Sequence, residues 1–127
     1  MTKDFKQTTT EDRADPYKRW RYRVEQPYVL DVDQIEWRGD QPVALLELTR
    51  CDSGSVTPAY LDAIVGRYEA DAQGRCARFV AAKLDIKAWI VLFTEDCTRF
   101  WVYNLTDRRG WWPLSEDQYE QWLTNLA

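Results

Sequence analysis

The stretch YVLDVDQIEWRGDQPVALLELTR, residues 28–50, decides the fold because it places acidic residues inside segments whose other residues favour burial. Two runs rich in Val, Leu, Ile and Trp flank the turn residues RGDQP at positions 38–42. Apolar runs of strand length on both sides of such a turn are typical of a β-hairpin. The sequence therefore predicts two antiparallel strands here.

The expected hairpin brings acidic residues together. With its bend centred near Asp40, residues whose numbers sum to 80 lie opposite each other, which pairs Asp33 with Glu47 and Asp31 with Thr49. All four share one face because side chains alternate along a strand. Opposed Cβ atoms lie roughly 4.5–5.5 Å apart, so two carboxylates there repel unless a cation or a shared proton compensates them.

A divalent cation is the economical compensation for this pair. Mg²⁺ binds proteins through one or two carboxylates, and waters and substrate phosphate oxygens complete its coordination shell. Two acids on neighbouring strands match that demand. The alternative is a solvated, charge-bearing face of an edge hairpin, because a slip of one residue in register sends the acids to opposite faces.

Length and composition limit the remaining possibilities. A chain of 127 residues fits one domain, and we expect a flexible N-terminal segment at residues 1–14 and a single domain at residues 15–127. No apolar segment reaches the roughly 18 residues of a membrane span, and the N-terminus lacks the apolar core of a signal peptide, so we expect a cytoplasmic location and no membrane partner. The chain has no histidine, and its three cysteines lack CxxC spacing, which excludes zinc sites and histidine-based triads.

The charge balance is acidic overall but contains one basic segment. A net charge of −4 argues against a basic coat for nucleic acid. Residues 17–23, YKRWRYR, interleave basic and aromatic side chains, a composition suited to phosphate backbones and to stacking on bases. The alternative is a solvated face that balances acids elsewhere. The seven Trp and seven Tyr residues are otherwise typical of core and interface fillers.

Helical patterns recur outside the hairpin. They cover residues 15–23, 58–71 and 75–84, followed by a last helix that Ser115 opens. Asp15 is the expected N-cap of the first helix, although the strict alternation of basic and apolar side chains in residues 19–24 also fits a strand. Gly74 weakens or breaks the run between the second and third helices. Gln118 completes a capping box with Ser115.

Apolar spacing predicts which side chains face the core. The expected buried stripes are Tyr60, Leu61, Ile64, Val65 and Tyr68; Cys76, Phe79, Val80 and Leu84; and Tyr119, Trp122, Leu123 and Leu126. Residues 88–94 form an almost continuous apolar run, which predicts a strand covered on both faces. A turn leads to a partner strand over 99–105, and a loop over 106–113 follows. The order helix, hairpin, helix or helix pair, hairpin, helix predicts an α/β (α+β) fold with a mixed sheet flanked by helices.

The order of acids and strands resembles the restriction-endonuclease-like PD-(D/E)xK nuclease superfamily. The resemblance rests on DVDQIE at 31–36 and PVALLELTR at 42–50. It is especially similar to small bacterial and phage members, in which a D-x-D-x-x-E strand runs into a P-V-A-L-x-E strand, and it extends faintly from about Tyr17 to the last helix. The resemblance implies an endonuclease that uses Mg²⁺ or Mn²⁺ and acts on nucleic acid; it favours DNA over RNA, and the sequence does not decide between them. A homodimer would suit a nuclease that cuts two strands.

Carried over by position, the resemblance implies that Asp33 and Glu47 bind the metal, with Asp31 as a helper. A third acid of the family would correspond to Glu11 or Glu25, between which the sequence does not decide. Thr49 stands where the family has its lysine, which is thought to orient or activate the attacking water. Threonine has a neutral side chain and cannot replace the positive charge of that lysine.

Four outcomes are open at the missing lysine. Lys83 or Lys87 could supply the cation from a neighbouring helix, or Arg50 could bend back although it points to the opposite face of a regular strand. The metal alone could activate water, or the site could be inactive. A lost donor of this kind costs on the order of 100- to 1000-fold in rate, which damages a metal-assisted hydrolysis without abolishing it.

Three functions follow from these residues. The first is a metal-dependent nuclease in which basic side chains contact the nucleic acid. These side chains are Arg19, Arg21, Arg50, Arg67 and Arg109. The second is a catalytically inactive member of the same fold that binds nucleic acid or protein. The third is an unrelated acidic domain that docks a partner through an aromatic loop at Trp111 and Trp112.

Overall fold

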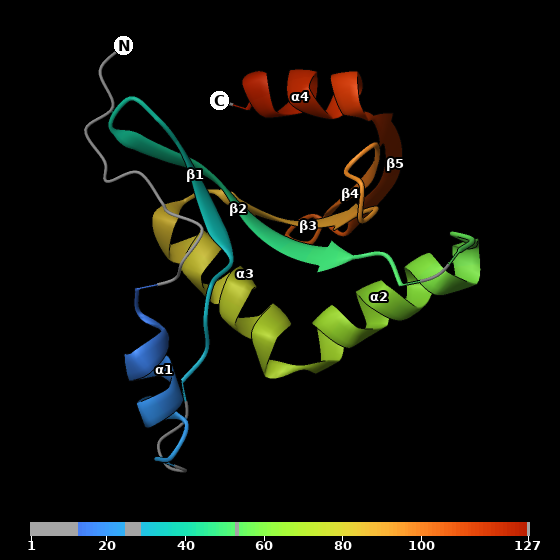
Figure 1. Cartoon of the computed structure of the whole chain (residues 1–127). Coiled ribbons are helices and arrows are strands. Elements are labelled where there is room, and N and C mark those ends of the chain that lie inside the picture. The colour runs from blue at the N-terminus through green and yellow to red at the C-terminus, as the bar shows by residue number, and fades with distance from the viewer. Residues whose placement is uncertain (1–12, 25–28, 53, 127) are drawn as a thin grey trace.

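The computed structural model describes residues 13–24, 29–52 and 54–126, which form a five-stranded sheet with helices on both faces (Figure 1). The elements are α1 (Asp15–Arg21), β1 (Gln34–Arg38), β2 (Gln41–Arg50), α2 (Pro58–Ala70), α3 (Ala72–Leu84), β3 (Lys87–Phe93), β4 (Arg99–Asn104), β5 (Arg109–Ser115) and α4 (Glu116–Thr124). The strands lie side by side in chain order. Neighbours are antiparallel except β2 and β3, whose parallel pairing requires the crossover made by α2 and α3. The expected α/β class with a mixed sheet is confirmed.

The hairpin of β1 and β2 is present as predicted. Three of its pairs obey the expected sum of 80: Gln34 with Leu46, Ile35 with Leu45, and Glu36 with Ala44. Gly39 forms the turn with Asp40 and takes a φ of +62°, a conformation that suits glycine. The register shifts by one residue next to this turn, after Glu36. The ladder ends at Gln34, so Asp33 lies just outside β1.

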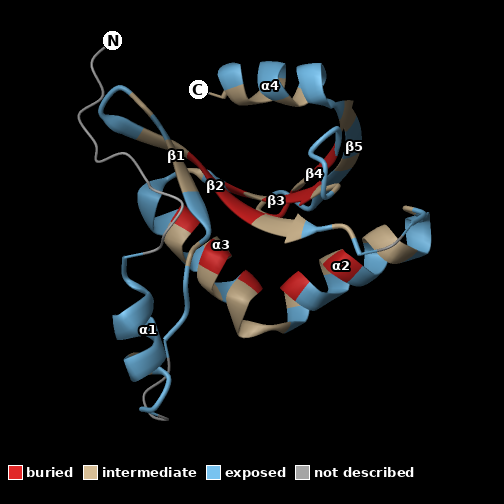
Figure 2. Cartoon of the chain, viewed as in Figure 1, coloured by how far each residue is buried: buried red, intermediate tan, exposed pale blue. Residues whose placement is uncertain are grey.

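Two apolar layers cover the two faces of the sheet, and Figure 2 shows buried residues along its central strands and on the inner sides of α2 and α3. The layer beneath α2 and α3 contains Leu45, Ile64, Tyr68, Ala77, Ala81, Ala88, Ile90, Leu92, Trp101 and Leu105. The other layer contains Ala44, Leu46, Val91, Phe100 and Val102, and Tyr119, Trp122, Leu123 and Leu126 of α4 pack against it. The predictions that β3 is covered on both faces and that α4 buries this stripe are confirmed.

Helix α3 buries a different face from the one that apolar spacing predicts. Its buried residues are Gly74, Ala77 and Ala81, whereas Phe79 of the expected stripe is 63% exposed. Small side chains allow the helix axis to approach the sheet closely, which leaves the larger apolar residues toward solvent. The expected face is therefore correct only in part: Val80 packs against the core, whereas Phe79 and Leu84 are exposed.

The break between α2 and α3 lies at Asp71 and not at Gly74. Asp71 ends α2 in an extended conformation and caps α3, because its Oδ1 accepts a hydrogen bond of 2.9 Å from the Gly74 nitrogen. A Cβ on Gly74 would lie 1.6 Å from the Tyr68 carbonyl oxygen. Gly74 thus belongs to α3 and permits the close corner between the two helices.

The first element is a helix and not a strand, as the proline near its start favours. Ala14 occupies the N-cap position, and no side chain caps this end. The expected N-cap, Asp15, is instead the first helical residue. Its negative charge still lies in the first turn, where it interacts favourably with the helix dipole.

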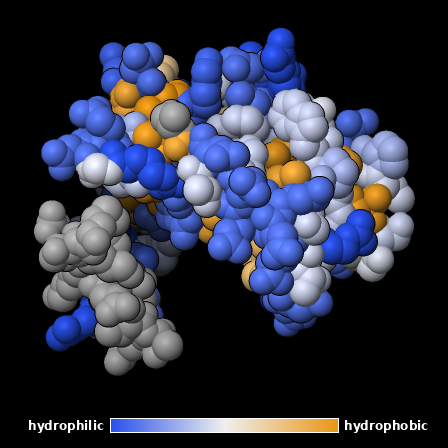
Figure 3. Space-filling view, turned by 90° about the horizontal axis from the view of Figure 1, so that it is seen from above, coloured by the Kyte–Doolittle hydropathy of each residue, from blue (hydrophilic) through white to orange (hydrophobic). Residues whose placement is uncertain are grey.

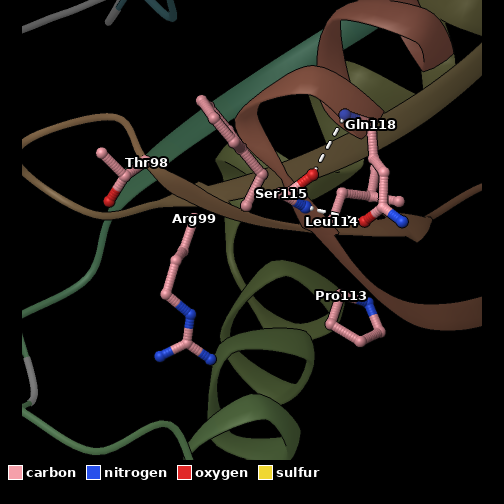
Figure 4. A pocket seen from close by; sticks show the side chains of 7 residues that line it. Thr98, Arg99, Pro113, Leu114, Ser115 and Gln118 are labelled. Carbon is pink, nitrogen blue, oxygen red and sulfur yellow. Dashed lines mark hydrogen bonds between the residues drawn. The ribbon is translucent and has the colours of Figure 1, made fainter.

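The loop expected over residues 106–113 is wrong, because β5 begins at Arg109. Gly110 and Pro113 indicated a loop, because both residues are uncommon inside strands. β5 is an edge strand, however, where the missing N–H of proline need not break a hydrogen bond of the ladder. Trp111 packs against Tyr103 with ring centroids 5.2 Å apart, so Trp111 and Trp112 lie on a strand and do not form a docking loop. The capping box of Ser115 and Gln118 that follows β5 is confirmed (Figure 4).

Two further features concern chemistry and location. Cys51, Cys76 and Cys97 are all free thiols. Within residues 13–24, 29–52 and 54–126, no helix combines the length and the apolar character that crossing a membrane requires.

Candidate functional site

A carboxylate lies at the centre of the sheet. Glu47 occupies interior strand β2, pairs with Ile90 of β3, and is 0% exposed. Because side chains alternate along β2, Glu47 shares its face with Leu45 and Thr49, beneath α2 and α3. Removal from water raises the pKa of Glu47, since the charged form is the one that burial disfavours.

Two neutral groups hold this carboxylate. The Gln73 side-chain nitrogen donates to Glu47 Oε1 over 2.6 Å, and the Asp33 backbone nitrogen donates to Oε2 over 3.1 Å. The same Gln73 nitrogen donates to the Asp31 carbonyl oxygen over 2.5 Å. These bonds lower the pKa of Glu47, but burial is the larger effect, and the nearby charges of Asp33 and Asp71 add to the increase.

Asp33 and Glu47 each accept a hydrogen bond from the backbone beside the other. Asp33 Oδ2 accepts from the Leu48 nitrogen over 2.9 Å, while the Asp33 nitrogen donates to Glu47. These two bonds connect the chain just before β1 to β2, where the regular ladder has ended. The structure thus brings the two expected metal-binding carboxylates together at one end of β1.

The acid pair has no cation of its own in the described part of the chain. No lysine or arginine among these residues forms an ion pair with Asp33 or Glu47. The nearby negative charge of Asp33 is one reason that the pKa of Glu47 is raised. The negative charge at this site is therefore left for a bound cation or a proton to neutralise.

Arg67 of α2 lies at the rim of the site. Its Nη2 is 3.5 Å from Thr49 Oγ1, a long hydrogen bond, and its guanidinium carbon lies 5.0 Å from the centroid of the Tyr68 ring. Thr49 is the position at which the resemblance to the nuclease superfamily places a lysine. A guanidinium from the helix α2 therefore lies next to the position where strand β2 lacks a cation.

Tyr68 forms the wall of the site between Arg67 and the acids. Its side chain is buried, and burial raises the pKa of its hydroxyl. The negative charges of Glu47 and Asp33 raise the pKa further, whereas Arg67 lowers it. The pKa of Tyr68 therefore depends on the charges of both the acids and Arg67.

The two lysines expected to supply a cation lie elsewhere. Lys83 is in the last turn of α3, ten residues after Gln73, which corresponds to about 15 Å along the helix axis. Lys87 pairs with Asp107 at 3.0 Å and lies opposite Ala44, three residues before Glu47. The structure does not bring either lysine to the carboxylates.

The other expected basic contacts are dispersed over the molecule. Arg50 lies at the end of β2, 3.7 Å from Asp52. Arg109 starts β5, at the edge of the sheet opposite β1, and Arg19 and Arg21 lie on α1. Of the third-acid candidates, Glu11 and Glu25 both fall outside the described residues.

Gln73 is a site residue that sequence reasoning missed. A usable signal was present, because Gln73, Ala77 and Ala81 recur every four residues and so share one helix face. That face turns out to be the buried one. A polar side chain in line with small residues on a buried face marks a group that reaches into the sheet.

The acid pair fits part of a magnesium coordination shell. The described residues contain no group of three or more His, Cys, Asp or Glu side chains placed to hold a metal. Mg²⁺ commonly binds through one or two carboxylates with waters and substrate phosphates. Asp33 retains Oδ1, and each oxygen of Glu47 retains a second lone pair beside its hydrogen bond. Asp31 contributes its carbonyl to Gln73, and its side chain is exposed.

A hollow of about 250 Å³ between β4, β5 and the start of α4 offers no comparable chemistry (Figure 4). Arg99 is the one charged residue among those that line it, and Figure 4 shows its guanidinium pointing away from Ser115 and Gln118. The Ser115 hydroxyl and the Gln118 side-chain oxygen are used by the capping box. This hollow therefore lacks the carboxylates that a metal site would need.

Comparisons with family models, with curated proteins and with solved structures return no significant match. A mixed sheet with helices on both faces supports many functions, so the fold alone selects none. The geometry around Asp33 and Glu47 is accordingly the basis for assigning a function.

Proposed function

We propose that this protein is a metal-dependent, restriction-endonuclease-like nuclease that hydrolyses phosphodiester bonds of nucleic acid, DNA in preference to RNA. The observation that carries the proposal is the buried Glu47 carboxylate beside Asp33, held by neutral donors alone among the described residues. Burying an uncompensated charge is costly, and a divalent cation offsets that cost. Mg²⁺ or Mn²⁺ bound by both carboxylates would complete the site.

Each residue of the site has a separate task in this proposal. Asp33 and Glu47 hold the cation, and Gln73 fixes the orientation of the Glu47 carboxylate. When bound between these two carboxylates, Mg²⁺ or Mn²⁺ would supply Lewis-acid chemistry for phosphodiester hydrolysis. Thr49 positions Arg67, whose guanidinium contacts a phosphate oxygen of the nucleic acid. Asp31 remains a candidate helper on the exposed side.

A metal titration tests the carboxylate pair. Mn²⁺ is expected to raise the melting temperature of the wild type, because binding to the folded state adds about 2.7 kcal/mol at 100 times Kd. Glu47→Gln and Asp33→Asn should each abolish the increase. Glu95→Gln, which changes an exposed acid in the turn after β3, should retain it. An equal increase in all four proteins, or none in the wild type, would refute the metal site.

A cleavage assay tests the chemistry. Labelled single-stranded, duplex and branched DNA, and RNA of the same sequence, are incubated with Mn²⁺ and the full chain. Cleavage should require Asp33 and Glu47, and Thr49→Lys should increase it by restoring a lysine at the family's position. Sedimentation of the active protein then measures its oligomeric state. A homodimer is the state expected of a nuclease that cuts two strands.

The second candidate is a catalytically inactive member of the same fold that binds nucleic acid or protein. Thr49 favours it, because the Arg67 hydrogen bond to Thr49 is long at 3.5 Å and no lysine lies at the carboxylates. This candidate predicts nucleic-acid binding that Glu47→Gln leaves unchanged, with no cleavage under any metal. The cleavage assay separates the two candidates directly.

A further inference from the structure

Among the described residues, helix α1 lies on the surface and away from the hydrophobic core. It has no buried residue, and it makes no extensive contact with another described helix or strand. Figure 1 shows it apart from the sheet, and Figure 2 shows it exposed along almost its whole length. Packing against the core therefore does not explain its composition.

The composition of α1 is unusual for an exposed helix. Tyr17 is 64% and Trp20 is 53% exposed, and their ring centroids lie 5.9 Å apart on one side of the helix. The face seen from above in Figure 3 is, by contrast, mostly hydrophilic, with hydrophobic side chains in small separate groups. Exposed, clustered aromatic rings indicate a surface that binds something.

The charge of this segment is opposite to that of the rest of the chain. Residues 17–23 contain Lys18, Arg19, Arg21 and Arg23 and no acid. Because the whole chain carries −4, the remaining residues carry a net charge of −8. Such an asymmetry points to a polyanionic partner that approaches the molecule on this side.

We propose that α1 together with Tyr22 and Arg23, here called the α1 arm, grips single-stranded nucleic acid. The inference rests on the proposed function and narrows its substrate class. Unpaired bases can stack on exposed rings, whereas a duplex hides its base faces. Arg19 and Arg23 of the α1 arm contact the phosphates between the stacked bases.

The connection of the α1 arm to the site supports this assignment. The chain runs from Arg23 to Asp31, whose carbonyl accepts from the Gln73 nitrogen that also holds Glu47. The eight peptide units from Arg23 to Asp31 span at most about 28 Å. The α1 arm is thus tethered to the segment that contacts the Gln73 and Glu47 pair by a short stretch of chain.

Binding measured without metal tests the α1 arm separately from cleavage. Fluorescence anisotropy of labelled oligo(dT) and of a duplex of equal length is recorded with the full chain in EDTA at low salt. The wild type should bind oligo(dT) more tightly than the duplex. Tyr17→Ala and Trp20→Ala should each weaken oligo(dT) binding about tenfold. Arg19→Gln with Arg23→Gln should lower the slope of log Kd against log salt by about 1.4.

Matched controls keep the test specific. Trp37→Ala removes another exposed tryptophan, 56% exposed on β1, and should leave binding unchanged. All α1 variants should retain the wild-type melting temperature, because their side chains pack on no core. Equal binding by wild type and the Trp20→Ala protein, or binding to vesicles of anionic phospholipid without binding to oligo(dT), would overturn the proposal.

The outcomes for the α1 arm and for the nuclease proposal are distinguishable. Binding that depends on Trp20 without cleavage in Mn²⁺ supports the α1 arm and refutes the nuclease. Cleavage that needs Glu47 but is unaffected by the α1 variants supports the nuclease and refutes the α1 arm.

Discussion

Gln73 and Glu47 are joined across 2.6 Å, so one amide of α3 fixes the only acid buried at the centre of the described sheet. The amide is neutral, and the bond satisfies a lone pair without cancelling the charge. The contact therefore holds the carboxylate in place and leaves its charge available. This relationship explains why a helix with mostly small buried residues carries a long polar side chain in its first turn.

Removing this amide should destabilise the fold. Gln73→Leu keeps the side-chain volume but leaves Glu47 with the Asp33 nitrogen alone, and an unsatisfied buried acceptor costs about 1–3 kcal/mol. Urea unfolding at pH 7 measures the loss. Gln121→Leu, which changes an exposed residue of α4, should alter the free energy of unfolding by less than about 0.5 kcal/mol. A Gln73→Leu protein as stable as that control would contradict the role assigned to the bond.

Two glycines in neighbouring helices should respond oppositely to alanine. Gly74→Ala places a Cβ 1.6 Å from the Tyr68 carbonyl oxygen and should cost more than about 2 kcal/mol. Gly66→Ala on α2 meets nothing within 4 Å and should stabilise by about 0.5–1 kcal/mol. Differential scanning calorimetry of the two variants checks both signs. Similar melting temperatures would show that the corner is looser than described.

Stability should fall in alkali through Tyr119. Tyr119 of α4 packs against the apolar layer on this face of the sheet, and burial there raises the pKa of its hydroxyl to about 12 from an ordinary value of 10.0. Between these values the unfolded chain loses the proton and the folded chain keeps it, so stability is complete below pH 10 and declines as pH rises toward 12. The loss is at most about 3 kcal/mol. Urea unfolding from pH 9 to 11 should show a steeper decline for the wild type than for Tyr119→Phe, and parallel curves would refute the assignment.

Arg67 should matter for cleavage and not for metal binding. Arg67→Ala removes the guanidinium at Thr49 and should reduce the cleavage rate on the order of 100- to 1000-fold, the usual effect of losing an electrostatic donor. The increase in melting temperature with Mn²⁺ should remain. Arg109→Ala, at the far edge of the sheet, serves as the control and should change the rate little. Loss of the Mn²⁺ effect in Arg67→Ala would place this residue in a structural role.

The register at the acids was predictable because it depends on local chemistry. A glycine turn and two apolar runs determine which residues pair, and Gln34 lies opposite Leu46 as the sum rule requires. The pairing rule does not predict where the β1–β2 ladder ends. Asp33 leaves the strand because its own backbone and side chain bond to Glu47 and Leu48, an arrangement that spacing alone does not express.

The helical part of the site was less predictable because it depends on tertiary packing. Large apolar residues marked the wrong face of α3, since close approach to the sheet selects Ala77 and Ala81. With that face misassigned, Gln73 had no visible role. The place of Arg67 depends on the corner at Asp71 and Gly74, which no single helix pattern encodes.

The parallel pairing of β2 with β3 has a consequence for folding kinetics. β3, β4 and β5 are joined by short connections and can form from local contacts, whereas β2 docks only after residues 51–86 have crossed over. Pairings of such long sequence separation form slowly and late. The burial of Glu47 therefore requires this crossover, because β3 and α3 cover it only once residues 51–86 are in place.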